Sequence, residues 1–287
     1  MRDIVIIGAG PAGISAALYS KRAGADVLVL YEGNSNLEKA EKIDNYYGFI
    51  NGIDGKVLYN NGIEQAQNLG IDVKKEEVID IQKEDEYFKI KTNKEEYISK
   101  VAIISTGSKI LKPNIKGISE FEGKGISYCA ICDGFFYKNK NVVVIGNGAF
   151  AENEANELKN IANNVKILTN GETAKIDSEF EIINKKISQI HGEEKVEIIE
   201  FDDGSKLDVD GIFIALGKAG GSDFAKKIGV MLNKNNIMTD ENMQTNVKGL
   251  YACGDTTGGL LQINKSIYEG AKAGLSAAKY VVKNSGQ

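Results

Sequence analysis

The sequence of 287 residues contains no long run of hydrophobic residues. The first apolar run, from Ile4 to Ile7, is too short for the core of a signal peptide and is broken at Gly8. No later run approaches the roughly 20 apolar residues that a membrane-spanning helix needs. We therefore expect a cytoplasmic protein with no membrane partner.

Cysteine is also scarce, with only Cys129, Cys132 and Cys253 in the chain. Three cysteines do not make a disulfide framework, so each is expected to have a redox, metal-binding or merely buried role. A structural zinc site would need all three thiols to meet the only histidine, His191. That histidine lies in a polar stretch where we expect solvent, so we predict no metal site.

The composition excludes two further classes of protein. Hydrophobic residues make up 42% and charged residues 26% of the chain, as in ordinary globular proteins, so disorder is not expected. The net charge of −5 argues against general binding of nucleic acid. The length is sufficient for two domains that each bury a core.

The first fifty residues predict a strand, a helix and a second strand around a glycine-rich turn. One apolar strand ends at Ile7, helical spacing follows the turn, and a second strand covers Val27 to Leu30. Residues 8–13 carry G-x-G-x-x-G, in which the glycines allow a tight turn, close approach to a pyrophosphate, and packing of helix on strand. The helix N-terminus faces the phosphates, and the carboxylate of Glu32 suits ribose hydroxyls. This pattern fits a flavin and a nicotinamide dinucleotide equally well.

The same pattern recurs in the second half of the chain. An apolar strand at 142–145 is followed by Gly146, Gly148 and Ala151, then by a helix and a strand ending at Leu168. The recurrence predicts two related α/β modules.

Each module continues with a polar stretch that contains turn signals, at residues 72–100 and 185–210. These stretches predict antiparallel strands, and each leads to an apolar strand that ends in glycine, at Gly107 and Gly217. Of the two prolines, Pro11 lies in the first turn and Pro113 fits a crossing point between the modules.

Several motifs, taken in order, resemble the thioredoxin reductase branch of the two-domain flavoprotein disulfide reductases. They are "GAGPAG", Glu32, "IDNYYGF", "STGS", "CAICDG", and "GLYACGDTTG" with a glutamine before a helix. The resemblance covers nearly the whole chain. It implies an α/β fold of two Rossmann-like three-layer domains, the second inserted into the first. The FAD-binding domain would comprise residues 1–112 and 243–287, and the NAD(P)-like domain with the C-x-x-C pair residues 113–242.

The resemblance also implies non-covalent FAD, a homodimer, thioredoxin as substrate, and particular site residues. The pyrophosphate would lie on the turn from Gly8 to Gly13, and the adenosine ribose on Glu32. The remaining residues would contact the adenine, the ribityl region and the flavin O2 edge. The implied cofactor-binding residues are Gly8, Gly10, Pro11, Ala12, Gly13, Glu32, Asn45, Val78, Thr106, Gly107, Gly254, Asp255, Gln262 and Ile263. Two of these have simpler interpretations, Asn45 as a turn residue and Asp255 as a helix N-cap.

In the same resemblance the two cysteines of "CAICDG" form a thiol relay. Cys132 would face the flavin and take its electrons, while Cys129 would attack the disulfide of thioredoxin. C-x-x-C spacing and a helix N-terminus lower a thiol pKa, which increases the thiolate fraction. Asp133 would donate or accept the proton during exchange. Half of a zinc site or a pair of inert thiols are the alternatives, and Cys253 is expected to be a buried structural thiol.

The second module departs from the family where NADPH would bind. The family has a His-Arg-Arg cluster after the second strand of this module, whereas this chain has Thr169, Asn170 and Gly171. The only arginines in the chain, Arg2 and Arg22, lie in the first module, so no guanidinium is available for a 2′-phosphate.

The glycine turn of the second module is altered too. Phe150 replaces a small polar residue, Glu152 adds negative charge, and "GKAGGS" stands where the family has G-x-x-P-N. Loss of one charge-assisted hydrogen bond costs about 1.5–3 kcal/mol, and loss of a cluster costs more. NADPH binding is therefore doubtful.

A subgroup with this pattern is the ferredoxin-dependent flavin thioredoxin reductases, which keep FAD and the C-x-x-C pair without the NADPH signature. The sequence therefore predicts a ferredoxin:thioredoxin reductase, with domain rotation presenting the dithiol to the flavin and to thioredoxin in turn. A degenerate NADPH-dependent thioredoxin reductase is the first alternative, and a non-catalytic FAD-binding redox sensor is the second.

Overall fold

The protein, described here from a computed structural model, divides into two compact units. The structure describes residues 1–33, 35–107, 113–128, 130–216, 220–233 and 235–284. Unit 1 comprises Met1–Lys109 and Gly220–Gln287, and unit 2 comprises Ile110–Ala219. The second unit is thus inserted into the first. Residues 220–242, which the sequence analysis assigned to the inserted module, belong instead to unit 1.

Unit 1 is built on a sheet whose strands have the order β3-β2-β1-β6, with β17 on the other side of β6. All four of these neighbouring pairs are parallel. The N-terminal part of β6 also begins an antiparallel meander with β5 and β4. The strands are β1 (Arg2–Ile7), β2 (Val27–Tyr31), β3 (Asp72–Lys75), β4 (Val78–Glu84), β5 (Tyr87–Thr92), β6 (Glu96–Ile104) and β17 (Leu250–Ala252).

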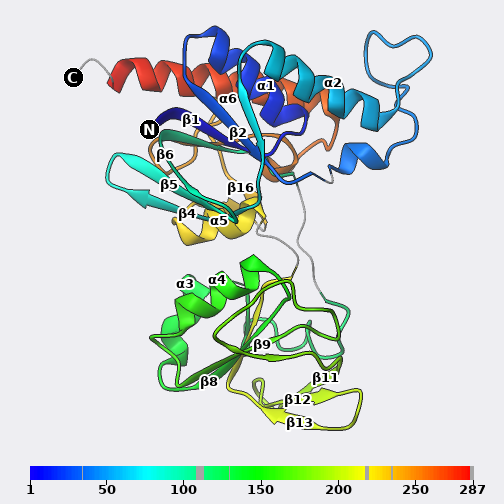
Figure 1. The fold of residues 1–287 in the computed structure, drawn as a ribbon, viewed down its shortest axis with the longest axis vertical. Coiled ribbons are helices and arrows are strands. Elements are labelled where there is room, and N and C mark those ends of the chain that lie inside the picture. Colours follow the sequence, from blue (N-terminus) through cyan, green and yellow to red (C-terminus); the bar gives the residue numbers. More distant parts are fainter. Residues whose placement is uncertain (34, 108–112, 129, 217–219, 234, 285–287) are drawn as a thin grey trace. The chain divides into compact units, whose positions relative to one another are not determined.

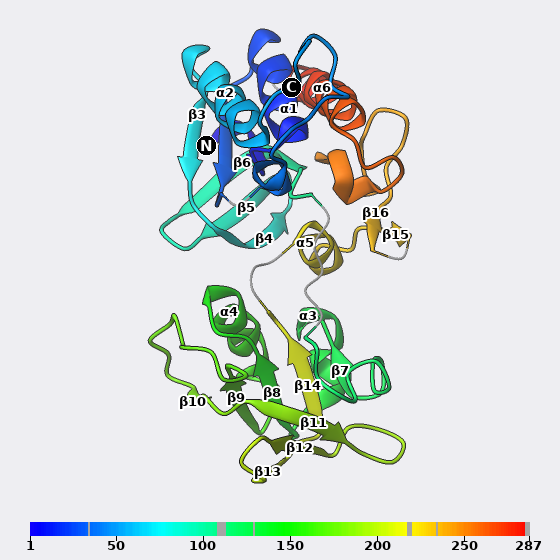
Figure 2. The same cartoon turned by 90° about the vertical axis from the view of Figure 1, so that its right-hand side faces the viewer.

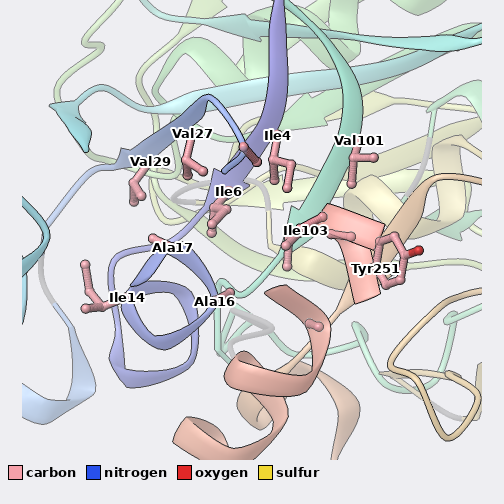
Figure 3. Close-up of a cluster of buried hydrophobic side chains, with 14 of the residues drawn as sticks. Ile4, Ile6, Ile14, Ala16, Ala17, Val27, Val29, Val101, Ile103 and Tyr251 are labelled. Carbon is pink, nitrogen blue, oxygen red and sulfur yellow. The ribbon is translucent and has the colours of Figure 1, made fainter. Parts of the chain in front are cut away.

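Three long helices cover one face of this parallel sheet, as Figure 1 shows. They are α1 (Pro11–Arg22), α2 (Gly55–Asn68) and α6 (Ile263–Asn284). Alternate strand residues such as Ile4, Ile6 and Ile103 point toward α1 and α6 and form the core in Figure 3. This is the period-2 alternation expected of a sheet covered by helices.

Helices α1 and α6 pack closely because small residues line their contact. A Cβ built on Gly270 would lie 2.1 Å from the Ala12 carbonyl oxygen, and one on Gly274 would lie 2.3 Å from that of Ala16. Ser15 and Ser20 donate hydrogen bonds to carbonyls of α6. The two ends of the chain are therefore joined in one core.

The shorter elements of unit 1 lie at its edges. Helix α5 packs against β4, where Lys227 and Asp80 form an ion pair whose side chains are both only 3% exposed. These elements are η1 (Asn36–Lys39), α5 (Gly221–Lys227), β15 (Leu232–Asn233), β16 (Asn236–Ile237) and η3 (Gly254–Thr257).

Unit 2 has three layers around a parallel sheet of order β10-β9-β8-β14-β7, seen in Figure 2. Val143, Ile145 and their neighbours pack against an antiparallel sheet, β11-β12-β13, while Val142, Val144 and Phe213 pack against α3 and α4. The elements are β7 (Ile126–Ser127), α3 (Ala130–Asp133), η2 (Gly134–Tyr137), β8 (Asn141–Ile145), α4 (Ala149–Leu158), β9 (Asn164–Leu168), β10 (Glu181–Ile183), β11 (Ile187–His191), β12 (Ile198–Phe201), β13 (Lys206–Asp208) and β14 (Gly211–Ile214).

Each unit therefore has its own parallel sheet of Rossmann type and an antiparallel three-stranded element. This architecture confirms the predicted fold class. None of the helices in the described ranges is long and apolar enough to span a bilayer.

Candidate functional site

The predicted FAD residues of unit 1 gather at the carboxyl edge of its parallel sheet. Gly8 follows β1, Glu32 follows β2, Thr106 follows β6, and Gly254 follows β17. The register aligns these strand ends, since Ile104 is opposite both Ile7 and Ala252. Open α/β sheets bind ligands at this edge, so the fold places the four residues where a dinucleotide fits.

The glycine turn after β1 is tight for a steric reason. Gly8 has φ +111°, a conformation that other residues rarely adopt. A Cβ built on Gly13 would lie 1.8 Å from the Gly8 carbonyl oxygen and 2.6 Å from Ser105 Oγ. Ser105 in turn donates a hydrogen bond to the Ile7 carbonyl at 2.9 Å. Helix α1 therefore begins in contact with two strands.

The space above the turn is open. A Cβ built on Gly10 would meet nothing within 4 Å, although Gly10 is the N-cap of α1 and supplies no side-chain cap. Pro11 occupies the first helical position, and Ala12 is buried beneath it. Within the described ranges, no side chain caps the first-turn amides, which is the arrangement that binds phosphate.

A buried polar atom marks the next strand end. Thr106 Oγ1 is inaccessible to solvent and has no hydrogen-bond partner among the residues that the structure describes. Beside it Gly107 has φ +75° and open space where a side chain would stand. Burying an unpaired hydroxyl is costly, so a polar ligand at this edge would satisfy it. The geometry of the turn and of Thr106 fits a dinucleotide cofactor.

Two predicted flavin-side residues, 217 positions apart, are brought together. Asn45 Nδ2 donates to Gln262 Oε1 at 3.2 Å, which links the exposed loop after η1 to the start of α6. Gln262 and Ile263 form the N-terminal end of that helix. Asn45 therefore has a long-range partner and is more than a local turn residue.

The other predicted contacts lie on different elements. Val78 is buried at the start of β4. Asp255 lies in η3, eight residues before α6 begins, so it is not the N-cap of that helix; its Oδ1 accepts a 3.4 Å hydrogen bond from Ser266 Oγ. Gly254 has φ +82° and packs against Ala12.

The redox motif is only partly described. Cys129 lies outside the described residues, and Cys132 belongs to α3 with its side chain outside them as well. Asp133 Oδ2 accepts a 2.7 Å hydrogen bond from Ser127 Oγ, which fixes the carboxylate at the end of this helix.

A second carboxylate, which the sequence analysis did not identify, holds the other end of α3. Glu154 on α4 is only 1% exposed, and its Oε2 accepts a 2.8 Å hydrogen bond from the amide of Ala130. That amide nitrogen forms the peptide bond with Cys129. Glu154 lies between Ala151, Ala155 and Leu158 on the apolar face of α4. An acidic residue at an otherwise apolar helix position is the sequence signal that could have identified it.

An exposed aromatic pair follows the motif. Phe135 and Phe136, in η2, are 76% and 69% exposed, and their rings are 6.4 Å apart in an edge-to-face arrangement. Large apolar side chains exposed beside a reactive motif are typical of a protein-docking surface.

The glycine turn of unit 2 is covered by its own chain. Asn147, between the two glycines, donates through Nδ2 to Glu172 Oε2 at 2.6 Å, and its carbonyl accepts from the Lys175 amide at 2.8 Å. Asn170 Oδ1 accepts from the Ile187 amide, and Thr169 Oγ1 bonds Asn184. These hydrogen bonds hold the segment after β9 against the turn.

Two other residues of unit 2 differ from expectation. The bulky ring of Phe150 is buried in the core with Val142 and Val144, so its bulk contributes to packing beneath the turn. His191 Nε2 lies 2.7 Å from Glu200 Oε2 on the neighbouring strand, so this side chain is paired and only part-exposed.

The third cysteine is a buried thiol, as expected. Cys253 has no exposed surface, and burial, followed by the Glu269 carboxylate, raises its thiol pKa far above the usual range. It therefore remains protonated and unreactive.

Comparisons with known proteins agree with this architecture. Residues 2–270 match the family model described as pyridine nucleotide-disulphide oxidoreductase. The thioredoxin reductase of Ureaplasma parvum serovar 3 is 35% identical, over 99% of this chain and 98% of that protein. The thioredoxin reductase of Bacillus subtilis is 31% identical, over 97% and 94%.

Two solved structures are similar over nearly the whole chain. The atypical thioredoxin reductase TRi from Desulfovibrio vulgaris Hildenborough has a TM-score of 0.92 and 38% identity, over 99% of both chains. A ferredoxin-flavin thioredoxin reductase from Clostridium acetobutylicum has a TM-score of 0.73 and 34% identity, over 98% of both chains.

Proposed function

The chain belongs to the thioredoxin reductase branch of the pyridine nucleotide-disulphide oxidoreductase family, and from this premise we propose that it is a ferredoxin:thioredoxin reductase. Electrons pass from reduced ferredoxin to FAD, then to the Cys129–Cys132 pair, and then to the disulfide of thioredoxin. The similarity to the ferredoxin-flavin enzyme of Clostridium acetobutylicum supports this donor.

The observation that carries the choice of donor is the covered glycine turn of unit 2. Glu172 brings a carboxylate to within 2.6 Å of Asn147 in the turn, and Glu152 adds another acid in the first turn of α4. Anions favour the N-terminus of a helix only where amides are free and no like charge is near. Together with the absence of arginine from unit 2, these carboxylates disfavour a phosphorylated nicotinamide cofactor.

The cofactor residues have separable roles. When bound, FAD accepts electrons one at a time from an iron–sulfur protein and passes them in pairs to a disulfide. The amides at the start of α1 would hold the pyrophosphate, and Glu32 would accept hydrogen bonds from the ribose. The Asn45–Gln262 pair fixes the N-terminal end of α6, whose dipole would favour negative charge at the flavin O2 edge.

The thiol pair completes a balanced exchange. The Cys129 thiolate attacks one sulfur of the thioredoxin disulfide, forming a mixed disulfide and releasing one thioredoxin thiolate. The Cys132 thiolate then attacks the Cys129 sulfur, so that the enzyme disulfide forms and the second thioredoxin thiolate leaves. Asp133, fixed by Ser127, exchanges the proton that each thiolate takes or loses. Two electrons from bound FAD would return the enzyme disulfide to the dithiol.

The test compares two donors under anaerobic conditions. The purified flavoprotein is mixed with oxidised thioredoxin and either NADPH or reduced ferredoxin, while flavin absorbance and thioredoxin thiols are followed. We expect ferredoxin to reduce the flavin at least about a hundredfold faster than NADPH at micromolar concentration, since several charge-assisted phosphate contacts are missing. Rapid reduction by NADPH would instead support an NADPH-dependent reductase. Flavin reduction without thioredoxin reduction would support a redox sensor.

The exposed aromatic pair is the proposed docking point for thioredoxin. Changing both Phe135 and Phe136 to alanine should raise the KM for thioredoxin about tenfold or more, because exposed aromatic anchors dominate such interfaces. The rate of flavin reduction by the donor should not change. Steady-state kinetics with Tyr87→Ala, an exposed aromatic on β5, as control would check this. An unchanged KM would remove the pair from the docking surface.

A stripe of exposed apolar residues on α6 supports the homodimer. Tyr268, Leu275 and Val282 follow one another at seven-residue spacing on this helix, and each is at least 41% exposed. Because i, i+7 positions share one face of a helix, they form a continuous apolar surface that a second copy would cover. Light scattering should show that Leu275→Glu shifts the dimer to monomer, whereas Leu69→Glu, off this helix, leaves the mass unchanged. A monomeric wild-type protein would contradict the proposal.

A further inference from the structure

A charged pair on α6 holds the turn that precedes this helix. Lys265 Nζ lies 2.8 Å from the Gly254 carbonyl oxygen, 2.6 Å from that of Gly258, and 3.0 Å from Glu269 Oε2. Both charged side chains are largely buried, with 15% and 14% of their surface exposed. The ammonium group thus bonds both ends of residues 254–258.

Glu269 contacts the same turn from one helical turn further along. Its Oε2 accepts a 2.9 Å hydrogen bond from the Gly254 amide and lies 2.8 Å from Thr257 Oγ1. Thr257 Oγ1 is also 2.9 Å from Lys265 Nζ. The Gly254 amide therefore donates to the anion, and the Gly254 carbonyl accepts from the cation. The two charges thus fix the peptide groups on both sides of this residue.

The position of Lys265 is unusual for a cation. It lies in the first turn of α6, where the helix dipole disfavours positive charge by about 0.3–1 kcal/mol at exposed sites. Its carbonyl partners and Glu269 offset this cost. The result is an ammonium group three residues after Gln262, at the same helix end that the proposed function gives to the flavin.

The pair also connects two of the proposed FAD contacts. Gly254, which hydrogen-bonds to both charges, immediately precedes Asp255. Ser266, the residue after Lys265, donates a 3.4 Å hydrogen bond to Asp255 Oδ1. The charges therefore lie between the ribityl contact and the contact at the flavin O2 edge. In a site of low dielectric constant, single charges at such a place change the energy of a charged cofactor state considerably.

We propose that Lys265 and Glu269 are positioning residues that set the midpoint potential of bound FAD in opposite directions. Lys265 stabilises the negative charge of the reduced flavin and so raises the potential, and Glu269 limits that effect. The inference rests on the proposed flavoprotein function. It explains how one flavin could accept electrons from a low-potential donor and still reduce a dithiol.

The experiment is an anaerobic titration of the flavin potential in the FAD-bound protein and its variants. Lys265→Met leaves the Glu269 carboxylate unopposed and should lower the equilibrium constant for flavin reduction about tenfold, or about 30 mV for a two-electron couple. Glu269→Gln keeps an acceptor for the Gly254 amide and should raise the constant by about the same factor. Lys265→Arg should stay within about threefold of wild type.

Lys279→Met is the matched control, because it removes one positive charge from an exposed position on the same helix. It should leave the potential unchanged. A purely structural clamp would weaken FAD binding in both variants without shifts of opposite sign, and that result overturns the proposal. If Lys265→Met does not retain FAD, the rise in the equilibrium constant for flavin reduction that is expected for Glu269→Gln tests the proposal by itself. Wild-type protein that binds no FAD would refute the proposed function instead.

Discussion

Replacing Cys132 by serine should stop thioredoxin reduction while the flavin remains reducible by its donor. The hydroxyl of serine is neither a thiolate nor able to form a disulfide, so electrons that reach the flavin would have no exit. Loss of a covalent catalytic group costs several powers of ten, and we expect turnover to fall by at least about a thousandfold. Flavin absorbance and thioredoxin thiols, followed in the same anaerobic sample, would separate the two half-reactions.

The control for this variant is Cys253→Ala, which removes the third thiol from a fully buried position. It should keep turnover within about twofold, because a protonated buried thiol takes no part in exchange. Sustained thioredoxin reduction by Cys132→Ser would refute the assigned relay. Lost activity in the Cys253 variant with an intact fold and flavin would assign that thiol a role the structure gives no reason to expect.

Replacing Gly13 by alanine should destabilise the protein, whereas the same change at Gly10 should mainly weaken FAD binding. At Gly13 the new methyl group would lie 1.8 Å from the Gly8 carbonyl oxygen, a contact that forces α1 away from β1. Overpacking of this kind costs about 1–3 kcal/mol, and the better helix propensity of alanine returns at most about 1 kcal/mol. Urea unfolding of the apoprotein should therefore show a clear loss of stability.

At Gly10 the backbone angles, φ −71° and ψ −179°, suit alanine, and its methyl group would meet no protein atom within 4 Å. The free energy of unfolding of the apoprotein should fall by about 1 kcal/mol or less, because alanine is a poorer N-cap residue than glycine. The methyl group would instead occupy the space above the turn, so the Kd for FAD should rise about tenfold or more. Unchanged FAD affinity in this variant would remove the turn from pyrophosphate binding.

The sequence was sufficient to predict the fold class because its signals are local. Alternating and helical periodicity around two glycine turns, at residues 8–13 and 146–151, defined both modules and their order. The second boundary was placed too late because α5 belongs to unit 1 through long-range contacts. The buried pair of Lys227 with Asp80 and the packing of Gly221 on Ile104 leave no trace in local patterns.

The resemblance predicted the candidate site residue by residue, and those roles stay predictions, but it did not predict the contacts among the residues. The resemblance indicated Asn45 and Gln262 separately, and only the fold shows that their side chains meet. Glu172 and Lys265 were missed because they lie outside the motifs, and only the fold brings them to the motif residues Asn147 and Gly254. From the sequence alone, a charged residue is interpreted as part of the solvated surface, because its burial and its partners are not known.

The close packing of α1 on α6 determines the order in which this protein can be built. Helix α1 leaves the ribosome long before the glycines that receive it, because Gly270 and Gly274 lie roughly 250 residues further along the chain. At 5–20 residues per second, the apolar face of α1 waits on the order of 10–50 seconds for its partner. Unit 2 is continuous in sequence and can fold during that interval. The nascent chain therefore carries a folded unit 2 while unit 1 is still incomplete, so unit 1 is the part that we expect to need protection from aggregation during synthesis.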